Sequence, residues 1–335
     1  MKMLGLGKWI ATSTSDGIAG FHLNELYSPW KTIVEVVVDY LEAKDDIELY
    51  KVFVNTSLGL PFEHKGGEQP EWKLLYERRE ERAEGQVPPE VLLLTCGVDV
   101  QKNRLEVSII GWNRKRSWLI EHKRLIGDTS NEEVWDDLSE LLDEEYDHPN
   151  GEKIPIRILG IDSGYQTAKV YEWVRKKSKR RVFALKGRDQ LDTPVSAPSV
   201  IDVNFRGKKT RAGIKLWKVG VSGLKSELYG RLNLEKPTEK QLEVKGYPKS
   251  WIAFPQTDEE YFKQLTAETC IIEKLSSGHA KYRWKKTYAE NHTLDCYIYA
   301  MAAYYVIGAN KWKPEKWEEL ENYYAEASSD KILTS

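Results

Sequence analysis

At 335 residues, with 41% apolar side chains, 12 Trp and 18 Tyr, the chain can build a packed core, which excludes global disorder. The length predicts about two domains, or one large domain with extensions. The net charge of −2 excludes a uniformly basic nucleic-acid binder, although a local basic patch could still bind DNA.

The three cysteines, Cys96, Cys270 and Cys296, form no C-x-x-C pair and no zinc-ligand spacing. We therefore expect free thiols in a reducing compartment. No apolar run approaches the roughly 20 residues that cross a bilayer, and the N-terminus lacks the apolar region of a signal peptide. These features predict a soluble intracellular protein without a membrane partner.

Residues 1–65 are expected to form a small, mainly helical segment. Apolar residues at helical spacing predict a helix over 30–43, and a second short helix is expected over 47–56. The GLGK stretch at 5–8 lacks the G-x-x-x-x-G-K-[ST] spacing of a phosphate loop, so ATPase activity is not expected from this chain alone. Paired glycines, prolines and a charge run over 66–90 predict a linker.

Residues 91–310 carry the strongest strand signals and are expected to form one domain. We expect strands over 91–100, 104–112, 117–122, 154–162 and 181–185, and helices over 130–146, 167–177 and 287–307. Three consecutive strands followed by alternating helices and strands predict an α/β fold, a mixed sheet flanked by helices. The basic stretch 187–250 is expected to be loop-rich, with strands over 214–219 and 251–254, and the polar tail 311–335 to lie at the surface.

Three aspartates occupy positions that usually favour apolar residues. Asp99 and Asp162 each end an apolar strand, and Asp295 lies within an apolar helix, one turn after His292. A buried ionised carboxylate is costly unless it is paired, hydrogen-bonded or metal-bound. Carboxylates held close together raise one another's pKa values, and divalent cations remove that penalty. Hard oxygen ligands favour Mg²⁺ or Mn²⁺, and two such ions about 4 Å apart would activate a water and stabilise the leaving oxygen of a phosphodiester.

Each of these residues also has a simpler interpretation. An aspartate after a strand is often a turn residue or a helix N-cap, and a single histidine is often structural. The strand–strand–helix order of the aspartates indicates a site more strongly than any one of them. We expect the oxygens of Asp99, Asp162 and Asp295 to be close enough to share a metal pair, with His292 a further ligand or a group that orients the nucleophile.

Basic residues provide candidate contacts to DNA phosphates. Lys186 and Arg188 follow the strand next to the predicted site, where a cation could hold the scissile phosphate, although a surface role fits equally well. The other candidates are Lys176, Lys177, Lys179 and Arg180 at a helix end, and Lys208 and Lys209 in the basic insert. A solvated helix end explains the first of these clusters about as well.

Several short motifs resemble the nuclease domain of phage terminase large subunits of the lambda (GpA-like) type. They are GVDVQ at 97–101, GIDSGY at 160–165 and HTLDC at 292–296, with supporting segments at 20–24, 26–30, 53–59 and 261–268. The resemblance implies a ribonuclease-H-like fold and an endonuclease that cuts concatemeric double-stranded DNA during genome packaging with two metal ions. It implies that Asp99, Asp162 and Asp295 bind the metal ions and act in catalysis with His292.

The same resemblance implies partners and a domain plan. We expect a terminase small subunit and a portal as partners in the host-cell cytoplasm, and we interpret 1–65 as the end of an ATPase domain. Residues 91–310 would then be the endonuclease domain. There are two alternatives. The first is a resolvase- or transposase-like nuclease of the same fold, which the N-terminal segment disfavours. The second is a non-catalytic module that binds DNA or the portal, which the three aspartates disfavour.

Overall fold

The computed structural model describes residues 8–10, 17, 20–44, 47–60, 68–189, 191, 193–203, 209–274 and 280–332. The chain divides into two compact units, Met1–His64 and Lys65–Ser335, which we describe separately. Among the described residues, no helix is long and apolar enough to cross a membrane.

In its described residues, the first unit contains a 3-10 turn, η2 (Glu25–Tyr27), followed by two short helices. Helix α1 (Ile33–Ala43) begins with a capping box, in which Thr32 and Glu35 bond each other's backbone N–H groups. Helix α2 (Ile47–Val52) runs into a π-helical turn, η3 (Phe53–Ser57). The helices expected over 30–43 and 47–56 are therefore both present, the first with a later start.

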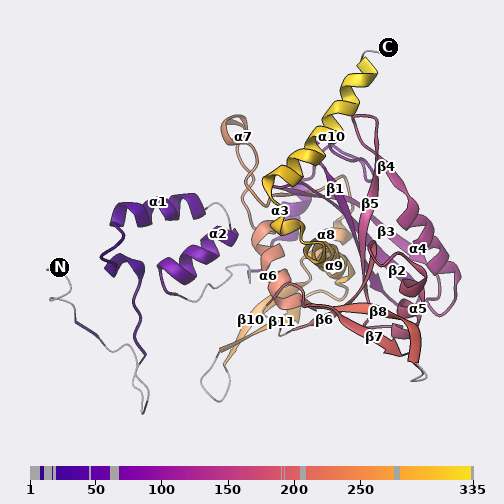
Figure 1. Ribbon diagram of the computed structural model, residues 1–335, viewed down its shortest axis with the longest axis horizontal. Coiled ribbons are helices and arrows are strands. Elements are labelled where there is room, and N and C mark those ends of the chain that lie inside the picture. The colour runs from indigo at the N-terminus through magenta and orange to yellow at the C-terminus, as the bar shows by residue number, and fades with distance from the viewer. Residues whose placement is uncertain are drawn as a thin grey trace. The chain divides into compact units, whose positions relative to one another are not determined.

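The second unit is a mixed sheet with helices on both faces (Figure 1). Its strands are β1 (Leu93–Val100), β2 (Arg104–Trp112), β3 (Ser117–Ile126), β4 (Glu145–Asp147), β5 (Lys153–Asp162), β6 (Val182–Arg188), β7 (Ser199–Val203), β8 (Lys209–Gly220) and β9 (Ile252–Ala253). They follow the order β7-β8-β6-β5-β1-β2-β3-β9, with β4 paired to β5. Neighbours among β1, β2 and β3 are antiparallel, whereas β1, β5, β6 and β8 run parallel. This arrangement confirms the predicted ribonuclease-H-like sheet.

Helices cover the two faces of this sheet separately. Helices α4 (Glu133–Asp143) and α5 (Thr167–Lys176) pack on one face, and α6 (Val221–Leu232) and α9 (His292–Val306) on the other (Figure 1). The remaining elements of this unit are α3 (Trp72–Glu77), α7 (Glu239–Lys245), α8 (Glu259–Leu265), η5 (Ala309–Lys311), α10 (Pro314–Ile332) and a hairpin of β10 (Glu268–Lys274) and β11 (Ala280–Lys286). Helices α6 and α7 lie in the stretch expected to be loop-rich.

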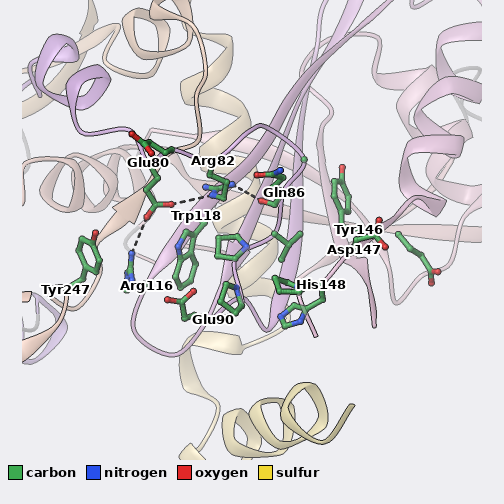
Figure 2. A pocket seen from close by; sticks show the side chains of 17 residues that line it. Glu80, Arg82, Gln86, Glu90, Arg116, Trp118, Tyr146, Asp147, His148 and Tyr247 are labelled. Atoms are coloured by element: carbon green, nitrogen blue, oxygen red, sulfur yellow. Dashed lines mark hydrogen bonds and ion pairs between the residues drawn. The ribbon is translucent and has the colours of Figure 1, made fainter. Parts of the chain in front are cut away.

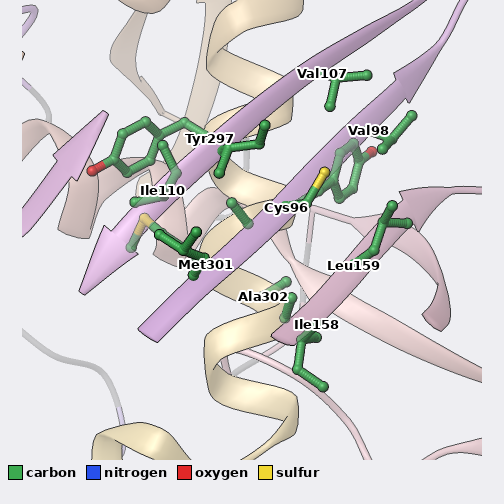
Figure 3. Close-up of a cluster of buried hydrophobic side chains, with 14 of the residues drawn as sticks. Cys96, Val98, Val107, Ile110, Ile158, Leu159, Tyr297, Met301 and Ala302 are labelled. Carbon is green, nitrogen blue, oxygen red and sulfur yellow. The ribbon is translucent and has the colours of Figure 1, made fainter. Parts of the chain in front are cut away.

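Helix α9 lies very close to the central strands because glycines face it. Gly97 and Gly160 are neighbours in the β1–β5 register. A Cβ atom at Gly97 would lie 1.9 Å from the carbonyl oxygen of Cys296, and one at Gly160 would lie 2.9 Å from that of Tyr299. The helix is apolar around most of its circumference, as expected for a buried element. Figure 3 shows its side chains Tyr297, Met301 and Ala302 beside the central strands.

The expected linker and the polar tail are both packed on the second unit. In the described residues 68–90, Leu75 of α3 and Val87 belong to its buried core. The tail forms α10, which buries Trp317, and the carbonyl of Tyr324 accepts a hydrogen bond from Asn150. These contacts make both segments part of the folded unit.

Candidate active site

Asp99 and Asp162 lie on the sheet face that α9 covers. Side chains alternate along a strand, so Asp99 shares a face with Gly97 two residues earlier, and Asp162 shares that face with Gly160. The parallel register of β1 and β5 then brings both aspartates to the same edge of the sheet. Asp99 is buried at 6% exposure, and Asp162 is partly buried.

Asp295 reaches the same region from the first turn of α9. Asp295 lies within this apolar helix, as predicted, but the helix begins at His292 and not at residue 287, so Asp295 is in its first turn. A carboxylate in the first turn is favoured by the helix dipole. Nδ1 of His292 lies 2.8 Å from Oδ2 of Asp99, a contact that links the start of α9 to the end of β1.

The negative charge of Asp99 acts on both of the other carboxylates. Burial raises the pKa of Asp162, and the charge of Asp99 raises it further. Burial also raises the pKa of Asp295 to about 7; Lys225 opposes this shift and Asp99 adds to it. The pKa of the buried Tyr299 is raised by burial and then by the charges of Asp162, Asp295 and Asp99. The site therefore concentrates negative charge that a cation would relieve.

The donor set fits a hard divalent cation, although it is not a ready-made metal centre. Across the described ranges, no three His, Cys, Asp or Glu side chains are grouped closely enough to hold a metal ion as they stand. The fit rests on the chemistry of the donors. Asp99, Asp162 and Asp295 offer carboxylate oxygens, and burial together with the charge of Asp99 raises the pKa values of Asp162 and Asp295. Such oxygens are the ligands that Mg²⁺ and Mn²⁺ prefer.

Hydrogen bonds hold Asp99 and fix the tautomer of His292. Oδ2 of Asp99 accepts from Nε2 of Gln101 at 2.7 Å and from His292. An ionised carboxylate can only accept, so Nδ1 of His292 carries the proton. The bond to Asp99 raises the pKa of His292. Sequence reasoning missed Gln101, although this residue ends the GVDVQ motif.

A buried charge cluster lies next to the site on β2 and β3. Glu106, which has no exposed surface, pairs across the strands with Asp99 and therefore shares its face. Its carboxylate accepts from Nε of Arg104 at 2.6 Å and from Nε of Arg124 at 3.3 Å, and it lies 3.0 Å from Nε2 of His122. The alternation of strand residues gave no signal for this cluster.

We expect Glu106 to make the stability of the protein depend on acid pH. Burial raises the pKa of Glu106, but hydrogen bonds from His122 and Arg104 and the nearby charges outweigh burial and lower it to about 2. Because the pKa of Glu106 is lower in the folded protein than the unfolded value of 4.5, its ionised form stabilises the fold at pH values above 4.5. This stabilisation is lost as the pH falls from 4.5 toward 2. The free energy of unfolding, measured with urea between pH 5 and pH 3, should therefore fall more steeply with decreasing pH for the wild type than for Glu106→Gln. Glu144→Gln, which alters an exposed acid paired with Lys123, is the matched control; equal pH slopes for wild type and Glu106→Gln would contradict the assignment.

The predicted DNA contacts are not gathered around the aspartates. Helix α5 runs back from the end of β5, so Lys176, Lys177, Lys179 and Arg180 lie near the start of β6, at the opposite edge of the sheet. Lys176 pairs with Glu172, and the Lys177 ammonium lies 5.3 Å from the Trp173 ring centre. Lys179 and Arg180 are exposed.

Lys186 and Arg188 lie at the same edge as Asp162 but on the other face. Asp162 pairs with Leu185, and Gly187 shares that face, so alternation turns the two basic residues away from α9. Lys208 lies outside the described residues. Lys209, described by its backbone only, begins β8 at the opposite edge.

A surface pocket at the start of β3 is separate from the aspartates. It is lined by Glu80, Arg82, Arg116, Trp118 and Tyr247, among others (Figure 2). Trp118 pairs with Gly111 of β2, which in turn pairs with Leu94 at the start of β1, whereas Asp99 lies near the end of β1. Both arginines already pair with Glu80, at 3.3 Å for Arg82 and 3.7 Å for Arg116. We therefore do not assign this pocket to the candidate site.

The strand order and the helices on both faces of the sheet define a ribonuclease-H-like domain. Residues 18–317 match the family described as terminase large subunit gpA, endonuclease domain. The chain belongs to this family.

The curated relatives of the chain are viral terminase large subunits. It is 32% identical over 296 residues to the terminase large subunit of Escherichia phage lambda, and 30% identical over 299 residues to that of Enterobacteria phage P21. Each match covers 88% of this chain and 44% of the relative, so the chain spans less than half the length of these relatives.

Two solved structures show weaker similarity. The large terminase nuclease of the thermophilic phage G20c has 14% identity and a TM-score of 0.34, covering 71% of this chain and 96% of that one. The large terminase of a second thermophilic bacteriophage has 12% identity and a TM-score of 0.39, covering 78% of this chain and 50% of that one. Similarities of this size carry no functional assignment.

Proposed function

We propose that this chain is a metal-dependent endonuclease of a viral terminase, which cuts concatemeric double-stranded DNA during genome packaging by a two-metal mechanism. The observation that supports the proposal is that Asp99 and Asp162 share one face and one edge of the sheet, and that Asp295 lies in the first turn of the helix that covers this face. The domain belongs to the gpA endonuclease family. Their shared negative charge is costly without a counter-ion.

In this proposal, the three carboxylates would hold Mg²⁺ or Mn²⁺. When bound, two such ions would activate water and stabilise the leaving oxygen of the phosphodiester. Gln101 and His292 hold the Asp99 carboxylate through its Oδ2 atom. A neutral His292 would present Nε2 as an acceptor, able to orient a water through hydrogen bonding or to bind a cation. Tyr299, whose pKa is raised by burial and by the nearby charge of Asp162, would help to orient this carboxylate.

The wider interactions of the chain are proposed from its family. We propose that Lys186 and Arg188 contact DNA beside the site, and that Lys176, Lys177, Lys179, Arg180, Lys208 and Lys209 contact DNA farther from it. Residues 1–65 would be the end of an ATPase domain, 66–90 its connection, 91–310 the endonuclease domain and 311–335 a tail. A terminase small subunit and a portal in the host-cell cytoplasm would be its partners.

Supercoiled plasmid provides a direct test of the proposed activity. We expect nicked and linear products with Mn²⁺ or Mg²⁺ and none with EDTA, as read by gel electrophoresis over time. Preference for branched junctions over plain duplex would favour a resolvase-like enzyme instead. DNA binding without cleavage under every metal condition would indicate a non-catalytic packaging module.

A further inference from the structure

A buried ion pair lies beside Asp295 that neither the aspartates nor His292 explain. Lys225 comes from α6 and Glu268 from the first position of β10, and their side chains are 10% and 6% exposed. Nζ of Lys225 lies 2.8 Å from Oε1 of Glu268. Removing two such charges from water carries a desolvation cost that often exceeds their attraction. The pair therefore adds little to stability by itself, and its position suggests another role.

Two contacts connect this pair to the third carboxylate of the site. Nζ of Lys225 lies 3.9 Å from Oδ1 of Asp295. Nδ2 of Asn291 donates to Oε1 of Glu268 at 2.8 Å and to Oδ2 of Asp295 at 3.0 Å. Each oxygen of Asp295 thus faces one member of the network formed by Lys225, Glu268 and Asn291.

The network is held in place by backbone contacts. The Tyr229 hydroxyl donates to the carbonyl oxygen of Glu268 at 2.9 Å and accepts from its N–H at 3.2 Å. Asn291 is the N-cap of α9, yet its side chain makes no capping bond and is directed to the carboxylates. An asparagine at this position usually caps the helix through its side-chain oxygen. Here the amide instead links β10 to Asp295.

We propose that Lys225 and Glu268 are positioning residues that, together with Asn291, orient the Asp295 carboxylate for divalent-cation binding. This inference rests on the proposed nuclease function. Partners that orient a metal ligand without touching the metal typically contribute 10- to 100-fold to metal affinity or activity. Breaking the pair should therefore weaken cation binding even where the fold survives.

Calorimetric titration with Mn²⁺ measures this effect without relying on activity. We expect Lys225→Met and Glu268→Gln to weaken Mn²⁺ binding at least about tenfold, and plasmid cleavage to need correspondingly more Mn²⁺. Because Lys225→Met leaves Glu268 buried and unpaired, the double variant Lys225→Met, Glu268→Leu provides a second test with both charges removed. It should be better folded than Lys225→Met and still bind Mn²⁺ weakly.

The same helix offers a matched control. Arg231 and Glu227 also form a mostly buried ion pair on α6, at 15% and 6% exposure, and neither forms a hydrogen bond or an ion pair with Asp295. The variant Arg231→Met, Glu227→Leu should alter thermal stability but bind Mn²⁺ as the wild type does. Wild-type Mn²⁺ affinity in a folded Lys225→Met, Glu268→Leu variant would overturn the positioning role. A wild type that neither binds Mn²⁺ nor cleaves plasmid would refute the proposed function itself.

Discussion

Asp99→Ala is expected to reduce Mn²⁺-dependent plasmid cleavage about a thousandfold or more, to the level seen with EDTA. Metal ions supply several kcal/mol of transition-state stabilisation, and a thousandfold loss corresponds to about 4 kcal/mol. We expect the substitution of Asp99 to have the largest effect of the three, because its charge acts on both Asp162 and Asp295 and its Oδ2 atom also accepts from His292. The rate of nicking under single-turnover conditions measures the effect.

Two further variants separate chemistry from folding. Asp99→Asn keeps a side-chain oxygen that can accept from His292 and Gln101, so it should fold like the wild type and still lose cleavage. Asp147→Ala removes an acid that is 87% exposed and pairs with Lys153, so it should cleave normally. Asp99→Asn should retain or gain thermal stability, because it reduces repulsion among the carboxylates and keeps the acceptor oxygen. Cleavage by Asp99→Asn at the wild-type rate would refute the assigned site.

Gly97→Ala is expected to lower the free energy of unfolding by more than about 4 kcal/mol, an exceptionally large cost for one methyl group. The added Cβ would lie 1.9 Å from the carbonyl oxygen of Cys296 and 2.5 Å from the backbone nitrogen of Ala300. Both obstacles are backbone atoms of α9, so the whole helix would have to move away from β1. Overpacking against mobile side chains usually costs only about 1–3 kcal/mol.

Urea unfolding followed by circular dichroism measures the effect of Gly97→Ala. Gly223→Ala is the control, because nothing lies within 4 Å of its Cβ position on α6. Alanine in a helix is favoured over glycine by about 0.5–1 kcal/mol, so this variant should be slightly more stable than the wild type. If both variants unfold at similar urea concentrations, the inference that α9 lies in close contact with β1 is refuted.

The sequence predicted the central strands β1 and β2 well because they are long and mostly apolar, whereas the short β4 and the outer β7 were not predicted. Every residue of β1 is buried, and β2 matches its expected bounds at both ends. Asp99 and Asp162 were recognisable because a carboxylate at the end of such a run is unusual. Their common face then followed from strand alternation and parallel pairing, which are properties of the backbone.

The surroundings of the aspartates could not be predicted in the same way. Helix α6 escaped prediction because Lys225 and Glu227 are buried on it, which obscures the apolar stripe of an amphipathic helix. Glu268 was visible only as the last residue of the 261–268 motif. Its pairing with Lys225 and Asn291 depends on tertiary contacts between segments far apart in the sequence, which local periodicity does not encode.

The insertion of α9 against β1 and β5 also bears on when the proposed nuclease site is complete. Asp99, Asp162 and Asp295 are far apart in the chain, and the last of them arrives only with α9. Contacts between such distant segments form slowly, because the intervening chain must first be ordered. A nascent or partly folded chain would therefore hold an incomplete set of acidic ligands. During refolding, recovery of cleavage should follow the slowest phase of tertiary structure formation, so that DNA is not cut before the domain is fully assembled.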